Sequence, residues 1–385
     1  MLMRARRILC VGFLVLSGPQ WVLAQSSPYV NDFLQMGLGT RALGMGGAPF
    51  VSIADDPSAI YWNPAGLTQI PRKEVEATYR QRYGGLFKDQ EISSVFPMNK
   101  SAFGFSYFQT TVGDVPVVRE LSQSEENSFV SNAGDLPAAS FSNTRDSALF
   151  MSWADVPIEN LSIGVTGKII NRNFLDTLHA WGYGLDSGAL YRKGPWGLGL
   201  SFQDLLQGLK WKGNDPNTNE DLSYNESAQI GVRMGVSYTM QVIEGGTTLT
   251  GSLSGERVGS GFWPRLGTEF NYRFIRFRGG LSINASDPQS DSGFKSSYTY
   301  QPSFGLGATV KSFELEYGLR FHPLGMIQSF SLNYKWGLNP NDINLTLPRH
   351  KLVLNKKTPS EDTSEMQSLM SLLNSDSSDS YAKRQ

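Results

Sequence analysis

Cysteine is almost missing from this chain, because its 385 residues contain only Cys10. A disulfide framework is therefore excluded. Long apolar runs are missing as well, since no segment after residue 24 approaches the roughly 20 apolar residues of a membrane-spanning helix. The sequence thus offers neither disulfides nor a helical membrane anchor.

A surplus of charge is absent too. The chain has 34 Lys and Arg against 35 Asp and Glu, so nothing suggests a nucleic-acid partner. His179, His322 and His350 are scattered, without a Gly-x-Ser-x-Gly nucleophile motif or the spacing of metal ligands. We therefore expect no enzyme, cofactor or metal. A Ser–His pair assembled from distant strands is the one enzymatic alternative, with His179 as its candidate.

The first residues predict export. Arginines within residues 4–7 precede a short apolar run at 8–16, and a small-residue motif follows at 22–24. This order is typical of a signal peptide, here residues 1–24, and the apolar run is too short for a membrane anchor. We expect the mature protein to reach the outer membrane of a Gram-negative-type bacterium.

The middle of the chain alternates in polarity. Leu266 and Phe270 fall on one face of a segment whose other face carries Arg265 and Glu269, which is the period of two expected for a β-strand. Similar segments have polar faces with glycines and full charges, too many ions for a dry core. Such strands are typical of a transmembrane barrel with an apolar exterior.

The alternation gives about fourteen strands, an even number that suits a bacterial barrel. Mostly short connections alternate with mostly longer ones, as short periplasmic turns and longer extracellular loops do in outer-membrane proteins. The predicted fold is an all-β, transmembrane antiparallel β-barrel at residues 73–337. The candidate strands are 74–80, 91–96, 101–109, 146–153, 161–172, 181–192, 195–203, 227–240, 246–255, 264–273, 275–284, 302–311, 312–321 and 328–337.

Charged side chains of the later strands should point into the lumen if this alternation is correct. We hypothesise that they form an ion-pair lattice that closes the barrel and anchors the N-terminal segment through Asp55 and Asp56. The alternative is a hydrated pore lining, as in porins. The predicted lumenal charges are Arg233, Arg265, Glu269, Arg273, Arg276, Arg278, Glu314, Glu316 and Arg320.

The two ends differ from the barrel. Residues 25–72 lack strand alternation, and they are too few and too glycine-rich to bury a core alone. We expect them to pack against the barrel as a hatch that plugs the lumen. Residues 338–385 contain a Ser/Asp-rich run and predict a largely disordered periplasmic tail.

The hatch segment carries the most specific motif. Its glycines at 37–47 do not form a nucleotide loop, because neither the strand–loop–helix spacing nor a P-loop lysine is present. Two short helical turns are predicted at 54–67, each with an N-cap residue before a proline. The motif residues are Asp55, Asp56, Pro57, Asn63, Pro64, Ala65 and Gly66.

The stretch from Gly39 to Leu67 closely resembles the N-terminal segment of PorV/PorQ-like outer-membrane proteins, which are similar to FadL-type long-chain fatty-acid transporters. Its Asp-Asp-Pro-Ser-Ala and Trp-Asn-Pro-Ala-Gly-Leu words carry the resemblance. In these relatives a fourteen-stranded barrel is plugged by an N-terminal hatch that contains the Asn-Pro-Ala turn. The resemblance covers the hatch strongly and the barrel only in its architecture.

Two functions follow from this resemblance. FadL-type members imply a barrel that binds or passes hydrophobic small molecules beside its hatch. The alternative, implied by PorV/PorQ-type members, is a component of type IX secretion that shuttles or scaffolds exported proteins. The expected partners are therefore outer-membrane lipid with either hydrophobic small molecules or exported proteins. The long polar tail departs from the transporter pattern.

Overall fold

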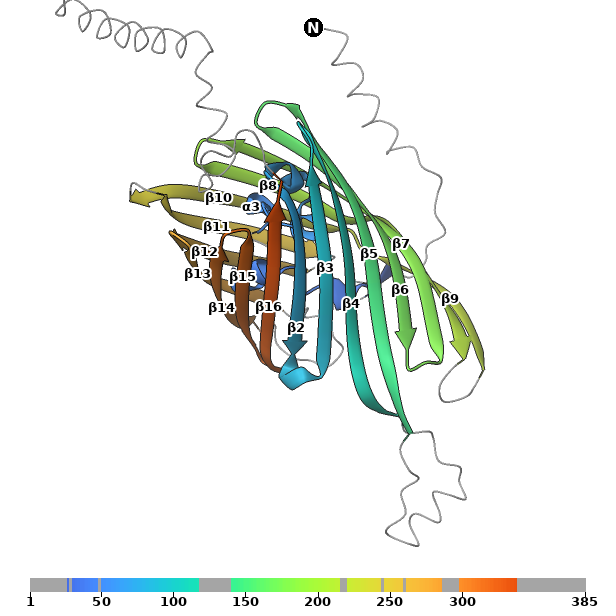
Figure 1. Ribbon diagram of the computed structural model, residues 1–385. Coiled ribbons are helices and arrows are strands. Elements are labelled where there is room, and N and C mark those ends of the chain that lie inside the picture. The colour runs from blue at the N-terminus through green and yellow to red at the C-terminus, as the bar shows by residue number, and fades with distance from the viewer. Residues whose placement is uncertain are drawn as a thin grey trace, which may run out of the picture.

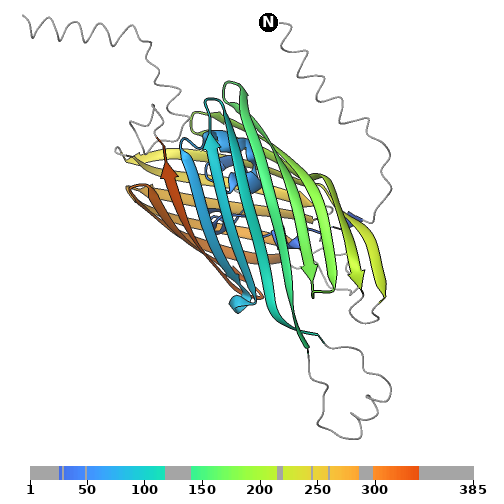
Figure 2. The same ribbon diagram turned by 45° about the vertical axis from the view of Figure 1, so that its right-hand side comes forward.

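The strands between Lys73 and Trp336 form a closed antiparallel ring (Figure 1 and Figure 2). This computed structural model describes residues 26–27, 30–47, 50–117, 140–214, 220–243, 246–258, 261–285 and 298–337. The strand that ends at Trp336 pairs with the strand that begins at Lys73, which closes the ring. The strands are β2 (Lys73–Arg82), β3 (Phe87–Pro97), β4 (Ser101–Val117), β5 (Ser140–Ile158), β6 (Leu161–Phe174), β7 (Leu178–Lys193), β8 (Trp196–Asn214), β9 (Asp221–Ala228), β10 (Gly231–Ile243), β11 (Thr247–Val258), β12 (Gly261–Tyr272), β13 (Ile275–Ala285), β14 (Tyr298–Val310), β15 (Phe313–His322) and β16 (Gly325–Trp336).

The ring has fourteen positions, which confirms the predicted barrel, because β9 and β10 share one position. β9 pairs with the far half of β8 and β10 with its near half. Between these halves the ladder is interrupted, and side chains bond the backbone instead. Asp204 N–H donates to Asp186 at 2.8 Å, and Ala228 N–H donates to Gln207 at 2.6 Å. On the other edge of β9, β1 (Ser26–Ser27) pairs in parallel.

The wall is apolar outside and polar inside. On β15, Leu315 is 43% exposed and Tyr317 is 41% exposed on the outer face, whereas Glu314, Glu316 and Arg320 are buried on the inner face. Strands that present one face to lipid and the other to an enclosed interior have this arrangement. The apolar positions of the alternating sequence therefore lie on the outer side of the wall, and the polar positions lie on its inner side.

Several connections predicted to be long are short. The predicted loops 81–90, 173–180 and 322–327 contract to 83–86, 175–177 and 323–324, because the strands extend beyond the predicted ends. β5 and β8 each reach 19 residues, although about 9–11 residues suffice to cross a membrane. Outside the lipid a strand needs no apolar face, so the alternation in polarity fades while the hydrogen-bond ladder continues.

The N-terminal segment, residues 30–70, lies inside the ring, where its blue helical turns are enclosed by strands in both views (Figure 1 and Figure 2). Its apolar residues are buried among the inner faces of the wall. Short turns joined by irregular backbone are consistent with its many glycines. Its elements are η1 (Asp32–Leu34), α2 (Thr40–Gly44), α3 (Phe50–Ile53), α4 (Ala59–Trp62) and η2 (Pro64–Gln69); η3 (Tyr83–Gly85) follows β2 in the wall.

In the described ranges no helix is long and apolar enough to cross a membrane. The predicted signal peptide (residues 1–24), the predicted tail (residues 338–385) and His350 lie outside the described residues. These two segments therefore stay predictions.

Candidate functional site

The N-terminal segment touches nearly the whole circumference of the lumen. α2 contacts β13 to β16, α3 contacts β8, β10 and β11, and η2 contacts β3 to β7. The turns of the segment pack on one another around Trp62, whose indole donates to Leu38 O at 2.9 Å, but each turn is too short to fold alone. The wall and these internal contacts together determine the conformation of the segment.

Asn63 connects three parts of this assembly. Its Oδ1 accepts a hydrogen bond from Ala65 N–H at 3.2 Å and so caps η2, with Pro64 at the first helical position. Its Nδ2 donates to the carbonyl oxygens of Val51 at 2.8 Å and Ala189 at 3.1 Å. A single buried amide thus ties η2 to α3 and to the wall strand β7.

Asp56 does not cap a helix as predicted, because the N-cap position of α4 is occupied by Ser58, two residues later. Asp56 accepts hydrogen bonds from the backbone N–H of Ser58 at 2.9 Å and from its hydroxyl at 2.6 Å. The helix α4 begins only at Ala59. Asp56 with Pro57 therefore forms the turn that leads into α4.

Glycines let the backbones of segment and wall approach each other. A β-carbon on Gly199 of β8 would lie 2.0 Å from the carbonyl oxygen of Val51, and one on Gly280 of β13 would lie 2.2 Å from the carbonyl carbon of Met45. Within the segment, a β-carbon on Gly66 would lie 2.0 Å from the carbonyl oxygen of Ala54. These contacts leave no room for a side chain, which explains the glycines on the inner faces of the strands.

The ion pair between segment and wall has the opposite polarity to the predicted one. Asp55 and Asp56 bind Arg41, at 2.7 and 3.3 Å, and not an arginine of the wall. Arg41 then binds Glu269 of β12 through two hydrogen bonds, of 2.7 and 2.8 Å. At this contact the segment supplies the arginine and the wall supplies the carboxylate, which corrects the predicted anchoring through Asp55 and Asp56. Asp32 is the acid of the segment that binds a wall arginine, Arg172, at 3.1 Å.

Asp55 and Asp56 differ in protonation. Burial opposes ionisation of Asp55, but the charges of Arg41 and Arg192 and the hydrogen bond from Arg41 together outweigh it and lower the pKa of Asp55. Burial raises the pKa of Asp56 to about 6, because its contact with Arg41 is longer and Glu316 and Asp55 add negative charge nearby. Asp55 is thus the firmly ionised partner, whereas Asp56 titrates just below neutrality.

Arginines of the wall bind the segment mainly through its backbone. Arg80 donates to Gly37 O at 2.9 Å, and Arg172 donates to Val30 O at 2.7 Å. An arginine on a rigid strand can satisfy carbonyl groups that short helical turns leave without partners. Further bonds of this kind are Arg80 to Gly39 O, Arg192 to Ser52 O and Ile53 O, Arg265 to Gly46 O, and Arg320 to Leu43 O.

Most of the predicted lumenal charges lie on the inner face of the wall. Arg273 does not: it lies in the β12–β13 turn, is exposed and stacks over Tyr272 at 5.4 Å, because the alternation ends one residue before it. This corrects its predicted inward orientation. The others are Arg233, Arg265, Glu269, Arg278, Glu314, Glu316 and Arg320, which are buried, and Arg276, which is 25% exposed and paired with Glu314.

The lumenal charges form connected groups. Arg278 binds Glu269 at 2.6 Å and Glu316 at 2.8 Å, and Lys335 binds Glu314 at 2.8 Å and also pairs with Glu74 at 3.4 Å, across the β16–β2 closure. Sequence reasoning missed the charges of the early strands, although the same alternation applied there could have found them. They include Glu76, Arg80, Arg82, Asp89, Glu91, Asp146, Lys168, Arg172 and Asp186.

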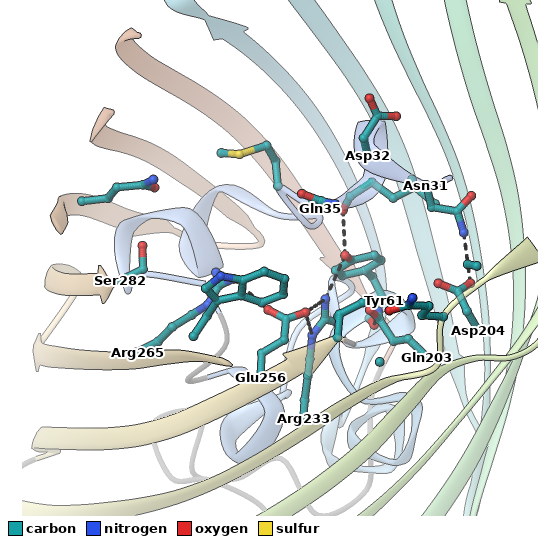
Figure 3. A pocket seen from close by; sticks show the side chains of 18 of the residues that line it. Asn31, Asp32, Gln35, Tyr61, Gln203, Asp204, Arg233, Glu256, Arg265 and Ser282 are labelled. Atoms are coloured by element: carbon teal, nitrogen blue, oxygen red, sulfur yellow. Dashed lines mark hydrogen bonds and ion pairs between the residues drawn. The ribbon is translucent and has the colours of Figure 1, made fainter. Parts of the chain in front are cut away.

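A cavity of ≈ 230 Å³ lies between the segment and the wall, and polar side chains from both line it. Figure 3 shows Arg233 and Arg265 converging on Glu256, while Asn31 and Asp204 are joined on the other side. Tyr61 lies between these groups and receives a hydrogen bond from Arg233 at 3.0 Å. The cavity is therefore a charged compartment bounded partly by the segment.

One strip of the lumen is apolar instead. The first turn of the segment covers it, with Phe33 stacked against Phe108 at 6.2 Å between ring centroids and Leu34 buried beside the strip. The segment thus covers part of this surface, and Arg172 and Tyr224 of the wall lie over Trp211. We name the strip by its residues, Phe108, Phe150, Ile170, Ala180, Leu209 and Trp211, on the inner faces of β4 to β8.

The two histidines within the described ranges do not gather at a site. His179 is exposed on β7, whereas His322 lines the cavity beside Tyr83, with ring centroids 4.9 Å apart. Among the residues that the structure describes, no group of three His, Cys, Asp or Glu side chains could hold a metal ion. The predictions of no enzyme and no cofactor stay predictions.

No protein-family model and no curated protein matches the sequence. The fold resembles the solved CymD monoaromatic hydrocarbon channel, with a TM-score of 0.53 and 13% identity over 79% of this chain and 98% of that chain. The chain has the fold of an outer-membrane channel. The P. putida toluene transporter TodX gives a TM-score of 0.51 and 12% identity, over 79% of this chain and 99% of that chain.

These neighbours are FadL-type channels, so the FadL-type resemblance is confirmed at the level of the barrel fold. No finding supports PorV/PorQ-like proteins specifically, and that resemblance stays a prediction. At 12–13% identity the likeness concerns the fold and not the ligand.

Proposed function

We propose that this protein is an outer-membrane channel for hydrophobic small molecules, and that residues 30–70 are its hatch. The observation that carries the proposal is the apolar strip, which is covered by Val30, Phe33 and Leu34 of the segment itself. An apolar surface in a charged lumen suits an apolar ligand, because its burial is favourable and removes no polar group from water. The hydrocarbon channels with this fold are consistent with such a ligand.

In this proposal the first turn of the segment is the gate. It is held by Arg172, which donates to Val30 O and pairs with Asp32. Asn31 bonds with Asp204 at 3.1 Å and with Gln207 at 3.0 Å, and Tyr61 donates to Leu34 O at 2.6 Å. A hydrophobic ligand competes for the contacts that this turn makes with the strip. The deeper part of the segment, bound to the wall all around the ring, stays in place.

A cross-link that holds the first turn on the wall tests the gate. Asn31 and Gln207 are joined by a 3.0 Å hydrogen bond, so cysteines at both positions can be bridged by a short bismaleimide, with Cys10 replaced by serine. The readout is the entry of the dye N-phenylnaphthylamine through the outer membrane of intact cells that express the protein. We expect dye entry in cells with the bridged Asn31→Cys/Gln207→Cys variant to fall to the level of cells without the protein.

The matched control bridges two wall positions outside the segment. Ser142 of β5 and Asp176 of the β6–β7 turn are joined by a 3.1 Å hydrogen bond. The bridged Ser142→Cys/Asp176→Cys variant should admit the dye as the wild type does. Equal dye entry through both bridged variants would show that the first turn is not the gate.

A further inference from the structure

Three arginines and one carboxylate, Glu256, line the cavity on the side of β10 to β15. Arg233 lies 2.6 Å from Glu256 Oε1, and Arg265 lies 2.7 Å from Glu256 Oε2. Both oxygens of Glu256 are therefore engaged. Arg320, the third arginine, is buried at 2% exposure, and no carboxylate within the described ranges forms an ion pair with it.

Arg320 and Arg265 also lie close to each other. A β-carbon built on Gly47 would lie 2.7 Å from Arg265 Nη1 and 3.3 Å from Arg320 Nη2, so these nitrogens are separated by no more than the sum of the two distances. Among the described residues, Arg320 donates one hydrogen bond, a 3.4 Å contact with Leu43 O. Two buried cations this close are costly unless an anion joins them.

Several polar atoms around the cavity have no partner. Arg233 Nη1, Arg265 Nε and Arg320 Nε are buried donors without a hydrogen bond, and so is the hydroxyl of Ser282. All four residues line the cavity, and Figure 3 shows Arg233, Arg265 and Ser282 around it. Buried donors are normally satisfied, so their concentration here indicates an acceptor-rich ligand.

The charge balance indicates how many charges the ligand carries. Within this cluster, three arginines and one glutamate leave two positive charges without compensation. Elsewhere around the cavity, Lys168 lies between Asp186 and Asp204 at 2.9 and 2.5 Å, an excess of one negative charge, and Arg82 binds Asp89 at 3.0 Å. Asp32 is paired with Arg172. A dianion would neutralise the arginine cluster.

We propose that this cavity binds a small phosphate dianion, either inorganic phosphate or a small phosphate monoester. The planar fork of arginine matches phosphate oxygens, and the volume and polar lining suit a compact, hydrophilic ligand. Arg265 and Arg320 also donate to carbonyl groups at Gly46 and Leu43 of the segment. Phosphate therefore holds the segment on the wall. The site lies apart from the apolar strip and goes beyond the proposed channel function.

Equilibrium binding tests the site without any transport assay. Inorganic phosphate or glycerol 3-phosphate is titrated into the intact protein in phosphate-free detergent, with chloride at matched ionic strength as the reference, and heat release is measured. We expect saturable phosphate binding that Arg320→Gln weakens about tenfold or more, since it removes a charged hydrogen-bond donor. Lys335→Gln, which removes a paired lumenal cation, should leave the affinity within about twofold of the wild type.

Thermal stability supplies a second readout that a purely structural arginine would not give. Without phosphate, Arg320→Gln should melt at a higher temperature than the wild type, because an uncompensated buried charge is gone. With saturating phosphate the order should reverse. The proposal is wrong if the wild type shows no saturable phosphate binding, or if the wild type and Arg320→Gln bind phosphate with equal affinity. It is also wrong if Arg320→Gln melts at a lower temperature than the wild type at every phosphate concentration. Binding of dihexanoylphosphatidate but of neither soluble phosphate would assign the site to lipid and also overturn it.

Discussion

Asn63 uses all its hydrogen-bonding groups inside the barrel, so its amide cannot be replaced by a group of the same shape. In Asn63→Asp, a carboxylate oxygen would face the carbonyl oxygens of Val51 and Ala189 where an N–H₂ group now donates. We expect a loss of at least about 3 kcal/mol in the docking of the segment. Hydrogen exchange of residues 50–68 measures it. Asn160→Asp, the same change in an exposed turn, should have no effect, and equal protection in the two variants would contradict the prediction.

Asp56 makes the docking of the segment depend on pH. Its pKa is about 6 in the folded protein against 3.8 as the reference value, so its contribution to stability is complete below about pH 4 and is lost as the pH rises through 6. Asp56→Asn cannot ionise, so relative to the wild type it should gain up to about 3 kcal/mol between pH 4 and pH 7.

Hydrogen exchange of residues 50–62, corrected for the intrinsic pH dependence of exchange, measures this gain. Asp55→Asn is the control, because the lowered pKa of Asp55 makes its contribution complete above about pH 4 and lost only at lower pH. It should therefore show no gain between pH 4 and pH 7. A stability difference between Asp56→Asn and the wild type that is constant over this range would refute the assignment.

At the scale of elements, the contact between α3 and β8 depends on the absence of a side chain. Gly199→Ala would place a methyl group against the Val51 carbonyl oxygen, where only 2.0 Å is available, and the backbone of α3 would have to move. We expect a cost of about 1–3 kcal/mol and faster proteolysis within the segment. Gly251→Ala is the control, because a β-carbon there meets nothing within 4 Å. Equal proteolysis of the two variants would argue against tight packing.

Alternation predicted the strands and the inner faces because lipid and lumen impose opposite polarities on neighbouring residues. It failed where that constraint ends. Arg273 lies in a turn, and the strand ends project beyond the apolar band. The pairing of Arg41 with Glu269 was unpredictable for another reason, since the path of a segment without periodicity depends on the wall around it. The Asn63 cap required only local sequence, and it was predicted.

At the scale of the whole molecule, the segment and the wall are separable. The wall is closed by its own hydrogen-bond ladder at β16–β2, so deletion of residues 26–68 should leave a folded barrel. The lumen would then lose the segment that contacts strands all around it. We expect a steady conductance in planar bilayers from the deletion variant and none from the intact protein. A large steady conductance from intact protein would show that the segment does not block the pore.

The distribution of segment contacts also bears on the order of assembly. α2 lies against β13 to β16, and η2 lies against β3 to β7, so the segment touches strands on both sides of the β16–β2 closure. If the segment docks before the ring closes, it would hold the free edges of β16 and β2 near each other. It would thereby reduce the entropy that is lost when these edges join. We expect the deletion variant to refold in detergent more slowly than the intact chain, by the shift in gel mobility of the closed barrel, and equal rates would contradict this. The residues that block the finished pore would then be the ones that help it to form.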